Sequence, residues 1–177
     1  MLETLITNKT RLKLLLKFFL NSNSSSYLRN LETEFDESSN AIRIELNRFE
    51  EAGLLVSNND RNRKIFRANV KHPLFPDIHN ILLKYIGFDQ IIDKLVHKLA
   101  GINKAYIVGD FAKGKDARNI ELILIGREFD KVYLENLIKK VEGLINRNVS
   151  CLILNTQEEG KYMNRHPEAF VLWKSEL

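Results

Sequence analysis

The sequence is poor in cysteine and in long apolar runs. One cysteine stands among 177 residues, so a disulfide framework cannot form within the chain. The apolar stretch from Leu14 to Leu20 is interrupted by Lys17 and is too short to span a bilayer. These absences exclude a disulfide-stapled domain and a membrane-spanning protein, and we expect a soluble cytoplasmic protein with no membrane partner.

Residues that bind transition metals are also few. The cysteine and the four histidines show no ligand spacing; they are His72, His79, His97, Cys151 and His166. Soft and borderline metals need several sulfur or imidazole ligands close together. We therefore expect no metal site and no cofactor, and we interpret Cys151, which stands in an apolar run, as an inert core thiol.

Charge and proline content set weaker limits. The net charge of +4 is mild, so it permits nucleic-acid binding without demanding it. The hydrophobic content of 44% is enough to bury a core. Of the three prolines, Pro73 and Pro76 stand close together, where they end a strand and exclude a helix before Asp77. This segment is the best candidate for a domain boundary.

The stretch from Ser38 to Lys71 organises the first part of the chain. Ile42, Leu46 and Phe49 recur at helical spacing, Ser38 or Ser39 can cap the first turn, and Gly53 suits the end of a helix. Two short strands follow, around residues 54–56 and 65–68, joined by a polar turn. We expect a helix followed by a β-hairpin.

Two further helices are predicted upstream, at residues 11–19 and 27–35, each with an apolar stripe. A serine and asparagine run at 21–26 separates them, and a short link at 36–39 leads to the helix that begins near Ser38. Three helices and a hairpin in this order form a helix-turn-helix with an appended wing.

The exposed face of the third helix and the hairpin are rich in hydrogen-bond donors. Asparagine and arginine match base edges in a major groove, and a basic hairpin suits phosphate contact. The alternative is that both surfaces are merely solvated. The predicted DNA-binding residues are Ser39, Asn40, Arg43, Asn47, Arg48, Arg61, Arg63 and Lys64.

The segment from Asn40 to Val56 resembles winged-helix repressors of the ArsR and MarR type, in which a recognition helix ends in a glutamate-rich turn followed by Ala-Gly-Leu and a strand. The resemblance covers the first 71 residues. It implies double-stranded DNA as a partner and a homodimer. Helices predicted at 78–86 and 88–100 form either a dimer interface or a connection between two domains.

After residue 104 the hydrophobic period changes from helix to strand. Strands are predicted at 105–108, 120–125 and 149–154, with an amphipathic helix at 131–146 between the last two. A polar loop with two glycines fills 109–118. A last helical segment is predicted at 158–177, broken near Pro167.

The run AYIVGDFAKGKDARNIELILIG resembles the core of the minimal nucleotidyltransferase fold, in which a strand, Gly-Ser, a basic-glycine pair and Asp-x-Asp follow one another. Gly109 and Lys113 match that pattern, whereas Asp110 replaces the serine and Asn119 and Glu121 replace the Asp pair. The resemblance implies a ligand pocket at Gly109, Asp110, Lys113 and Glu121. One carboxylate cannot hold two metal ions, so no catalytic residue is expected and nucleotide binding is not favoured.

These inferences predict an α+β protein. Residues 1–71 form the winged helix-turn-helix, 72–103 a proline-containing linker with helices, and 104–177 a nucleotidyltransferase-like α/β domain with a mixed sheet and a helical tail. The whole chain resembles one family of predicted transcriptional regulators. We therefore expect a sequence-specific DNA-binding regulator, not an enzyme, whose second domain serves dimerisation or ligand sensing. The alternatives are an active minimal nucleotidyltransferase and a protein-interaction module, for which the exposed Ile44 is an argument.

Overall fold

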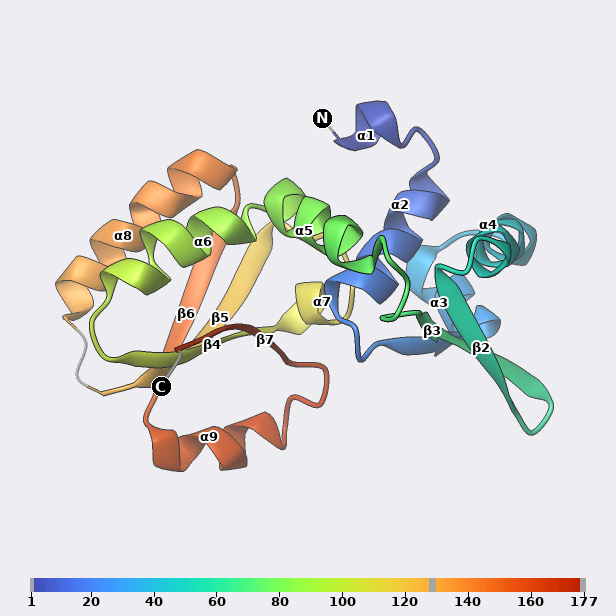
Figure 1. Ribbon diagram of the computed structural model, residues 1–177. Coiled ribbons are helices and arrows are strands. Elements are labelled where there is room, and N and C mark those ends of the chain that lie inside the picture. The colour runs from blue at the N-terminus through green and yellow to red at the C-terminus, as the bar shows by residue number, and fades with distance from the viewer. Residues whose placement is uncertain (1, 128–129, 176–177) are drawn as a thin grey trace. The chain divides into compact units, whose positions relative to one another are not determined.

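The computed structural model describes residues 2–127 and 130–175. The chain divides into two compact units, Met1–Leu82 and Leu83–Leu177. Both units combine helices with a sheet, so the fold is α+β, as predicted (Figure 1). The final two residues of the helical segment predicted at 158–177 lie outside the described part of the chain.

The first unit contains short helices around a small sheet. Its elements are α1 (Leu2–Leu5), α2 (Lys9–Leu15), a π-helical turn (Leu16–Leu20), β1 (Ser25–Tyr27), α3 (Leu28–Phe35), α4 (Ser39–Glu51), β2 (Leu55–Asp60) and β3 (Arg63–Ala68). Helix α5 (Phe75–Ile86) spans the division between the units.

The second unit contains four strands and several helices. Its elements are α6 (Phe88–Lys94), a 3-10 turn (Val96–Lys98), β4 (Ile102–Val108), α7 (Gly109–Ala112), β5 (Asn119–Gly126), α8 (Lys131–Ile145), β6 (Asn148–Leu154), α9 (Thr156–Met163) and β7 (Phe170–Lys174).

Helix α4 forms for the reasons that its sequence suggests. The Ser38 side chain accepts a hydrogen bond from the Ala41 backbone amide at 3.3 Å, which satisfies one free donor of the first turn. Ile42, Leu46 and Phe49 are all buried, so the predicted stripe faces the core. The prediction of this helix is confirmed.

The sheet of the first unit has the order β1-β3-β2, and both pairs are antiparallel. The β2–β3 hairpin was predicted, but β1 was not, because residues 21–26 are polar and were interpreted as a link. Strand β1 exists because Ser25, Ser26 and Tyr27 pair with the free edge of β3. A three-residue polar strand has too little apolar pattern to be recognised locally.

The prolines act differently from the prediction. Helix α5 begins at Phe75, not after Asp77, so Pro76 lies in its first turn. The missing amide hydrogen of a proline costs nothing there, because the first amides of a helix have no intrahelical partner. The exclusion of a helix before Asp77 was therefore wrong.

The sheet of the second unit is mixed, as predicted. Its order is β6-β5-β4-β7, with β5 and β6 parallel and the other pairs antiparallel. Helix α8 makes the crossover between the parallel strands and, with α6, covers one face of the sheet (Figure 1). Helix α9 covers the other face, where Tyr162 and Met163 pack against Val108, Ile123 and Ile125.

Two predicted helices of the second unit differ from the structure. The helix expected at 88–100 ends at Lys94 and continues only as a 3-10 turn. The segment expected to be helical after residue 158 is α9 followed by a strand, β7. That strand forms because Phe170–Lys174 pairs with the otherwise open edge of β4, a contact between segments far apart in sequence.

Candidate functional site

The candidate site of the second unit lies where β4 ends and β5 begins. Val108 pairs with Glu121 across the two strands, and Gly109 follows with a φ of 71°. A Cβ added at Gly109 would overlap Oε1 of Glu121, so the carboxylate lies directly against the glycine. The left-handed φ and this close approach both require glycine at position 109.

Helix α7 and the loop after it form a compact turn beside that carboxylate. The Lys113 backbone amide donates hydrogen bonds to the backbone carbonyls of Gly109 and Asp110 at 3.2 and 3.1 Å. The Lys115 backbone amide donates to the backbone carbonyl of Asp110 at 2.9 Å. The side chains of Asp110, Lys113 and Glu121 are exposed. The four residues predicted as a ligand pocket are thus arranged around one turn, with Gly109 and Glu121 in contact.

Arg147, which the sequence analysis did not single out, holds this loop in place. Its Nη1 donates to the Asp116 carboxylate at 2.7 Å and to the Ala117 carbonyl at 2.5 Å. Its guanidinium lies 5.3 Å from the ring centroid of Phe111 on α7. Only 17% of the Arg147 side chain is exposed. The arginine therefore connects the start of β6 to the glycine-containing loop.

A polar hollow of about 500 Å³ adjoins this loop. It is lined by Asp116, Ala117, Arg118, Asn146 and Arg147. Arg118 is the loop residue directly before β5. A basic residue beside a predicted strand is the signal in the sequence that could have identified it. Arg147 could not be identified from the sequence, because helix α8 brings it to the loop only in the folded chain.

Two carboxylates flank Gly109, that of Glu121 in contact with it and that of Asp110 next to it in sequence. No group of three His, Cys, Asp or Glu side chains suited to a metal occurs within residues 2–127 and 130–175. The Asn119 amide donates to Ser150 Oγ at 3.3 Å and supplies no charge. Magnesium is commonly bound through one or two carboxylates plus substrate phosphates, and Glu121 with Asp110 can provide that set.

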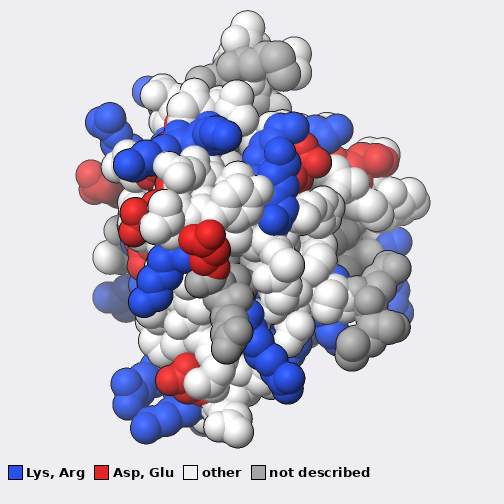
Figure 2. Space-filling view, turned by 90° about the vertical axis from the view of Figure 1, so that its left-hand side faces the viewer, with Lys and Arg blue, Asp and Glu red and all other residues white. Residues whose placement is uncertain are grey.

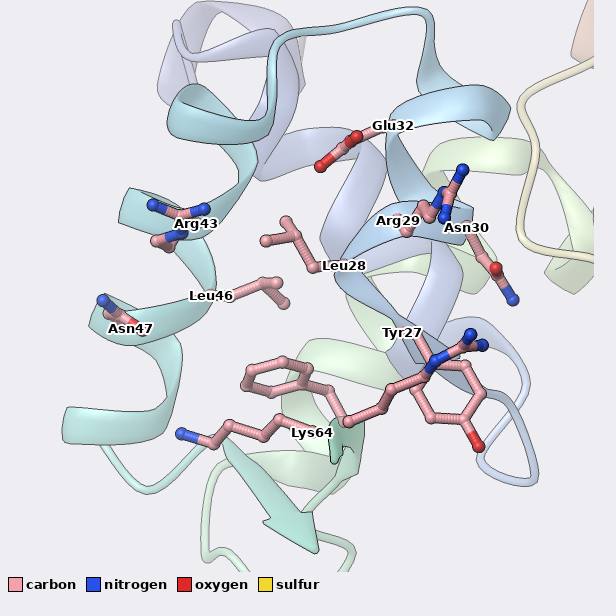
Figure 3. Close-up of a pocket in the computed structure, with 11 residues that line it drawn as sticks. Tyr27, Leu28, Arg29, Asn30, Glu32, Arg43, Leu46, Asn47 and Lys64 are labelled. Atoms are coloured by element: carbon pink, nitrogen blue, oxygen red, sulfur yellow. The ribbon is translucent and has the colours of Figure 1, made fainter. Parts of the chain in front are cut away.

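The residues predicted to bind DNA lie in the first unit, and four of them line one hollow. Figure 3 shows Arg43 and Asn47 extending from α4, with Lys64 across the hollow from them. Arg63, which also lines the hollow, lies with Lys64 on β3. The apolar Leu46 lies between them in the same lining. These side chains therefore surround a partly apolar hollow instead of forming a continuous polar surface.

Several of the predicted DNA contacts are held by carboxylates. Arg48 Nη1 lies 2.6 Å from Glu45, and Lys64 Nζ lies 2.6 Å from Glu50. The Ser39 hydroxyl donates to the Glu32 carboxylate. These pairings cancel part of the positive charge that the sequence alone suggests.

The remaining two residues of that set lie at the ends of their elements. Asn40 stands in the first turn of α4, and Arg61 occupies the β2–β3 turn with a φ of 55°. On the face that Figure 2 shows, lysine and arginine side chains are scattered among acidic and uncharged ones.

No helix among the described residues is long and apolar enough to cross a bilayer.

Comparison with known proteins found similarity to solved structures. No protein-family model and no curated protein matches the chain. A mutant of the toxin–antitoxin pair MntA-HpeT matches with a TM-score of 0.40 and 16% identity, over 50% of this chain and 74% of that chain. The tri-AMPylated Shewanella oneidensis HEPN toxin in complex with MNT antitoxin matches at 0.37 and 13%, over 50% and 71%.

A third match is a candidate nucleotidyltransferase from Sulfolobus solfataricus, with a TM-score of 0.37 and 17% identity over 60% of this chain and 93% of that chain. Each of these three similarities covers between 50% and 60% of this chain.

These matches contradict the main functional prediction. A sequence-specific DNA-binding transcriptional regulator was expected, but the matched structures are described as toxin–antitoxin pairs and a candidate nucleotidyltransferase, which agree better with the alternative of a minimal nucleotidyltransferase. The expectation that the chain is not an enzyme is corrected for the same reason. Arg48 and Lys64 are paired with glutamates, so this surface carries less unpaired positive charge than the sequence suggests.

Proposed function

We propose that the chain is a minimal nucleotidyltransferase, which transfers a nucleoside monophosphate from a nucleoside triphosphate to a hydroxyl group of a macromolecule. The observation that carries the proposal is the contact between the Glu121 carboxylate and Gly109 at the junction of β4, α7 and β5. It sets an acidic group beside a glycine turn, where a magnesium ion carried by a triphosphate would meet a carboxylate.

The site divides its chemistry between acidic and basic groups. Glu121 and Asp110 would hold one magnesium ion, and Lys113 and Arg118, exposed on the same loop, would attract the phosphates. A magnesium ion bound with the triphosphate neutralises charge on the departing pyrophosphate. Asp110, which follows Gly109 directly, would supply the second carboxylate that Asn119 cannot provide.

The transfer itself balances without a further reactant. The acceptor oxygen forms a bond to the α-phosphorus, the bond from that phosphorus to the α–β bridging oxygen breaks, and pyrophosphate leaves. The proton of the acceptor hydroxyl passes to water, to which the exposed site is open. Because the protein forms no covalent bond in this scheme, its contribution is positioning and electrostatic stabilisation.

The first unit supplies a place for the macromolecular acceptor. This unit has the element order α2, β1, α3, α4, β2, β3 and the sheet order β1-β3-β2, and its helices and hairpin are separate from the candidate transfer site of the second unit. We assign to this unit the binding of the acceptor, which is either a protein or an RNA. A homodimer stays a prediction, and sedimentation of the purified chain tests it.

The direct test is label transfer by the full chain. Each of the four nucleoside triphosphates, labelled at the α-phosphate, is supplied with magnesium, total cell protein and total RNA, and labelled macromolecules and released pyrophosphate are measured. We expect Glu121→Gln to lower transfer at least a hundredfold, because it removes the charge that holds magnesium. Glu135→Gln on α8 is the matched control, since Glu135 is exposed and belongs to another element.

Two results would overturn the proposal. One is the absence of transfer with all four nucleotides in both acceptor pools. The other is transfer that Glu121→Gln leaves unchanged. A thermal shift with magnesium and each nucleotide separates binding from transfer, because a ligand at a hundred times its Kd stabilises the folded state by about 2.7 kcal/mol. A thermal shift without transfer would mean that the second unit is a nucleotide-binding domain and not an enzyme.

A further inference from the structure

The first unit contains a hollow of about 480 Å³ between α3, α4 and β3. Figure 3 shows Leu28 of α3 and Leu46 of α4 directed into the space between the two helices. Phe66 of β3 completes the apolar lining. A volume of this size falls in the range of pockets that bind small molecules, which are mostly apolar with a few placed polar groups.

The apolar lining is fixed by the core of the unit. Leu46 is 1% exposed and Phe66 is 4% exposed, so most of each side chain packs inward and only an edge reaches the hollow. Lys64 Nζ lies 5.2 Å from the Phe66 ring centroid and closes one side. The hollow therefore exists without a ligand and needs little rearrangement to accept one.

Positive groups surround the hollow. Arg43 extends from α4 on one side and Arg29 from α3 on the other (Figure 3). Arg63 of β3 also lines the hollow. Within the described ranges, these three guanidinium groups form no ion pair, whereas Lys64 is paired with Glu50. The one acidic residue of the lining, Glu32, accepts a hydrogen bond from the Ser39 hydroxyl. The charge facing the hollow is thus positive.

We propose that this hollow binds a small amphipathic anion. An aliphatic or aromatic body would lie against Leu28, Leu46 and Phe66, and a carboxylate or phosphate would be held by two of the three arginines. Arginine suits both groups, because its planar fork donates two parallel hydrogen bonds. Asn30 and Asn47 also line the hollow and can donate to a second polar group of the ligand. The proposal is independent of the nucleotidyltransferase assignment, which concerns the other unit.

Displacement of a fluorescent probe tests the proposal. The full chain is titrated with anilinonaphthalene sulfonate, an apolar anion, at near-physiological salt, and the bound probe is competed with octanoate, octyl phosphate, octanol, acetate and inorganic phosphate. We expect displacement by octanoate and octyl phosphate only. The first of these carries a carboxylate and the second a phosphate, so their relative strength identifies the preferred head group.

Variants distinguish binding in the hollow from non-specific binding of the probe. The double variant Arg43→Gln/Arg63→Gln is expected to weaken octanoate binding at least tenfold. Arg67→Gln is the matched control, because Arg67 lies on the same strand as Arg63 and is exposed but does not line the hollow. Leu28→Trp, which fills the space and keeps every charge, is expected to abolish binding. Circular dichroism and the thermal midpoint of each variant verify that it is folded.

The outcomes are distinct. Displacement by octanol as strong as by octanoate would mean a plain apolar surface, and displacement by acetate or inorganic phosphate would mean a plain charge effect; either would overturn the proposal. Unchanged octanoate binding in both the double arginine variant and Leu28→Trp would place the probe elsewhere and overturn it equally.

Discussion

The carboxylate of Glu121 lies against the Cα of Gly109, so the residue that supplies charge to the candidate site also restricts what can occupy the neighbouring position. A side chain at 109 would meet Oε1 and would force a left-handed φ on a residue other than glycine. We expect Gly109→Ala to lower the free energy of unfolding by about 2 kcal/mol, of which the left-handed backbone accounts for about 1–2 kcal/mol. Urea unfolding measures this.

Two further variants show whether the loss of stability comes from the contact between residue 109 and Glu121. Gly143→Ala, on α8, meets nothing within 4 Å and should stabilise the protein by about 0.8–1 kcal/mol, as expected for replacing glycine in an exposed helix. In the double variant Gly109→Ala/Glu121→Ala, the steric part of the loss should disappear. Strict additivity of the two single substitutions would contradict the contact.

Asn119→Asp is expected to raise nucleotidyl transfer. Asn119 stands two residues before Glu121 on β5, so the replacement adds a second strand carboxylate of nearly the same shape. Its hydrogen bond with Ser150 Oγ can persist with the hydroxyl as donor. The magnesium concentration at half-maximal transfer should fall severalfold. A similar fall with Asn148→Asp, at the exposed start of β6, would instead indicate a general effect of added charge.

Arg147→Ala is expected to loosen the loop that contains the candidate site. It removes two hydrogen bonds, to Asp116 and Ala117, and the packing over Phe111. We expect a loss of about 1–3 kcal/mol and faster hydrogen exchange at residues 113–118. Arg165→Ala, at an exposed position after α9, should change neither. Unchanged exchange in the Arg147 variant would mean that α7 alone orders the loop.

The first unit should become less stable in acid because of Glu45. The hydrogen bond from Arg11 lowers the pKa of Glu45 below its ordinary value of 4.5, against the opposing effect of burial, and Arg48 lowers it further. A carboxyl group whose pKa is lower in the folded state stabilises the protein above the unfolded pKa, and this contribution is lost as the pH falls from about 4.5 through the folded value.

Glu45→Gln tests that contribution. The variant should lose about 1–3 kcal/mol at pH 7, since Glu45 is 2% exposed and bonded to two arginines. The difference from the unsubstituted chain should shrink steadily below pH 4.5. Glu51→Gln, at an exposed position of the same helix, provides the comparison. A difference that stayed constant down to pH 3 would assign the loss to packing and not to charge.

Cys151 should resist alkylation in the folded protein. Burial raises the pKa of its thiol to about 12, so at pH 8 only about one thiol in ten thousand is ionised, and the thiolate is the reactive form. Iodoacetamide labelling followed by mass spectrometry should be about a thousandfold slower than for an exposed cysteine. Cys151 is partly buried. Urea should remove the protection, and equally rapid labelling before and after unfolding would contradict the raised pKa of the thiol.

The helices and strands with a strong local pattern could be predicted from the sequence. Helix α4 follows from the stripe of Ile42, Leu46 and Phe49, and β4 and β5 from apolar runs beside a glycine loop. The segments that were missed or misassigned, β1 and β7, are short strands that exist because a partner strand offers an open edge. Pairing with a strand that is distant in sequence does not produce a recognisable hydrophobic pattern within a few consecutive residues.

The candidate sites were predictable only in part, for the same reason. Gly109 and Glu121 stand in a recognisable motif, so their proximity could be expected. Arg147 lies beside that loop only because helix α8 returns the chain to it. Arg29 and Arg63 line the same hollow only because α3 and β3 are neighbours in the folded unit. The basic residues of α4 and the hairpin were recognised, but the glutamates that pair with Arg48 and Lys64 could not be assigned from spacing alone.

The position of β7 at the edge of the sheet also has a consequence for biosynthesis. The sheet of the first unit is complete once Ala68 has left the ribosome, whereas β4 lacks one neighbour until the strand from Phe170 to Lys174 has been made. During the synthesis of α8, β6 and α9, the edge of β4 therefore stays open, and unpaired strand edges are templates for association with other chains. The nascent second unit is most vulnerable to aggregation in this interval, and the last strand ends that exposure.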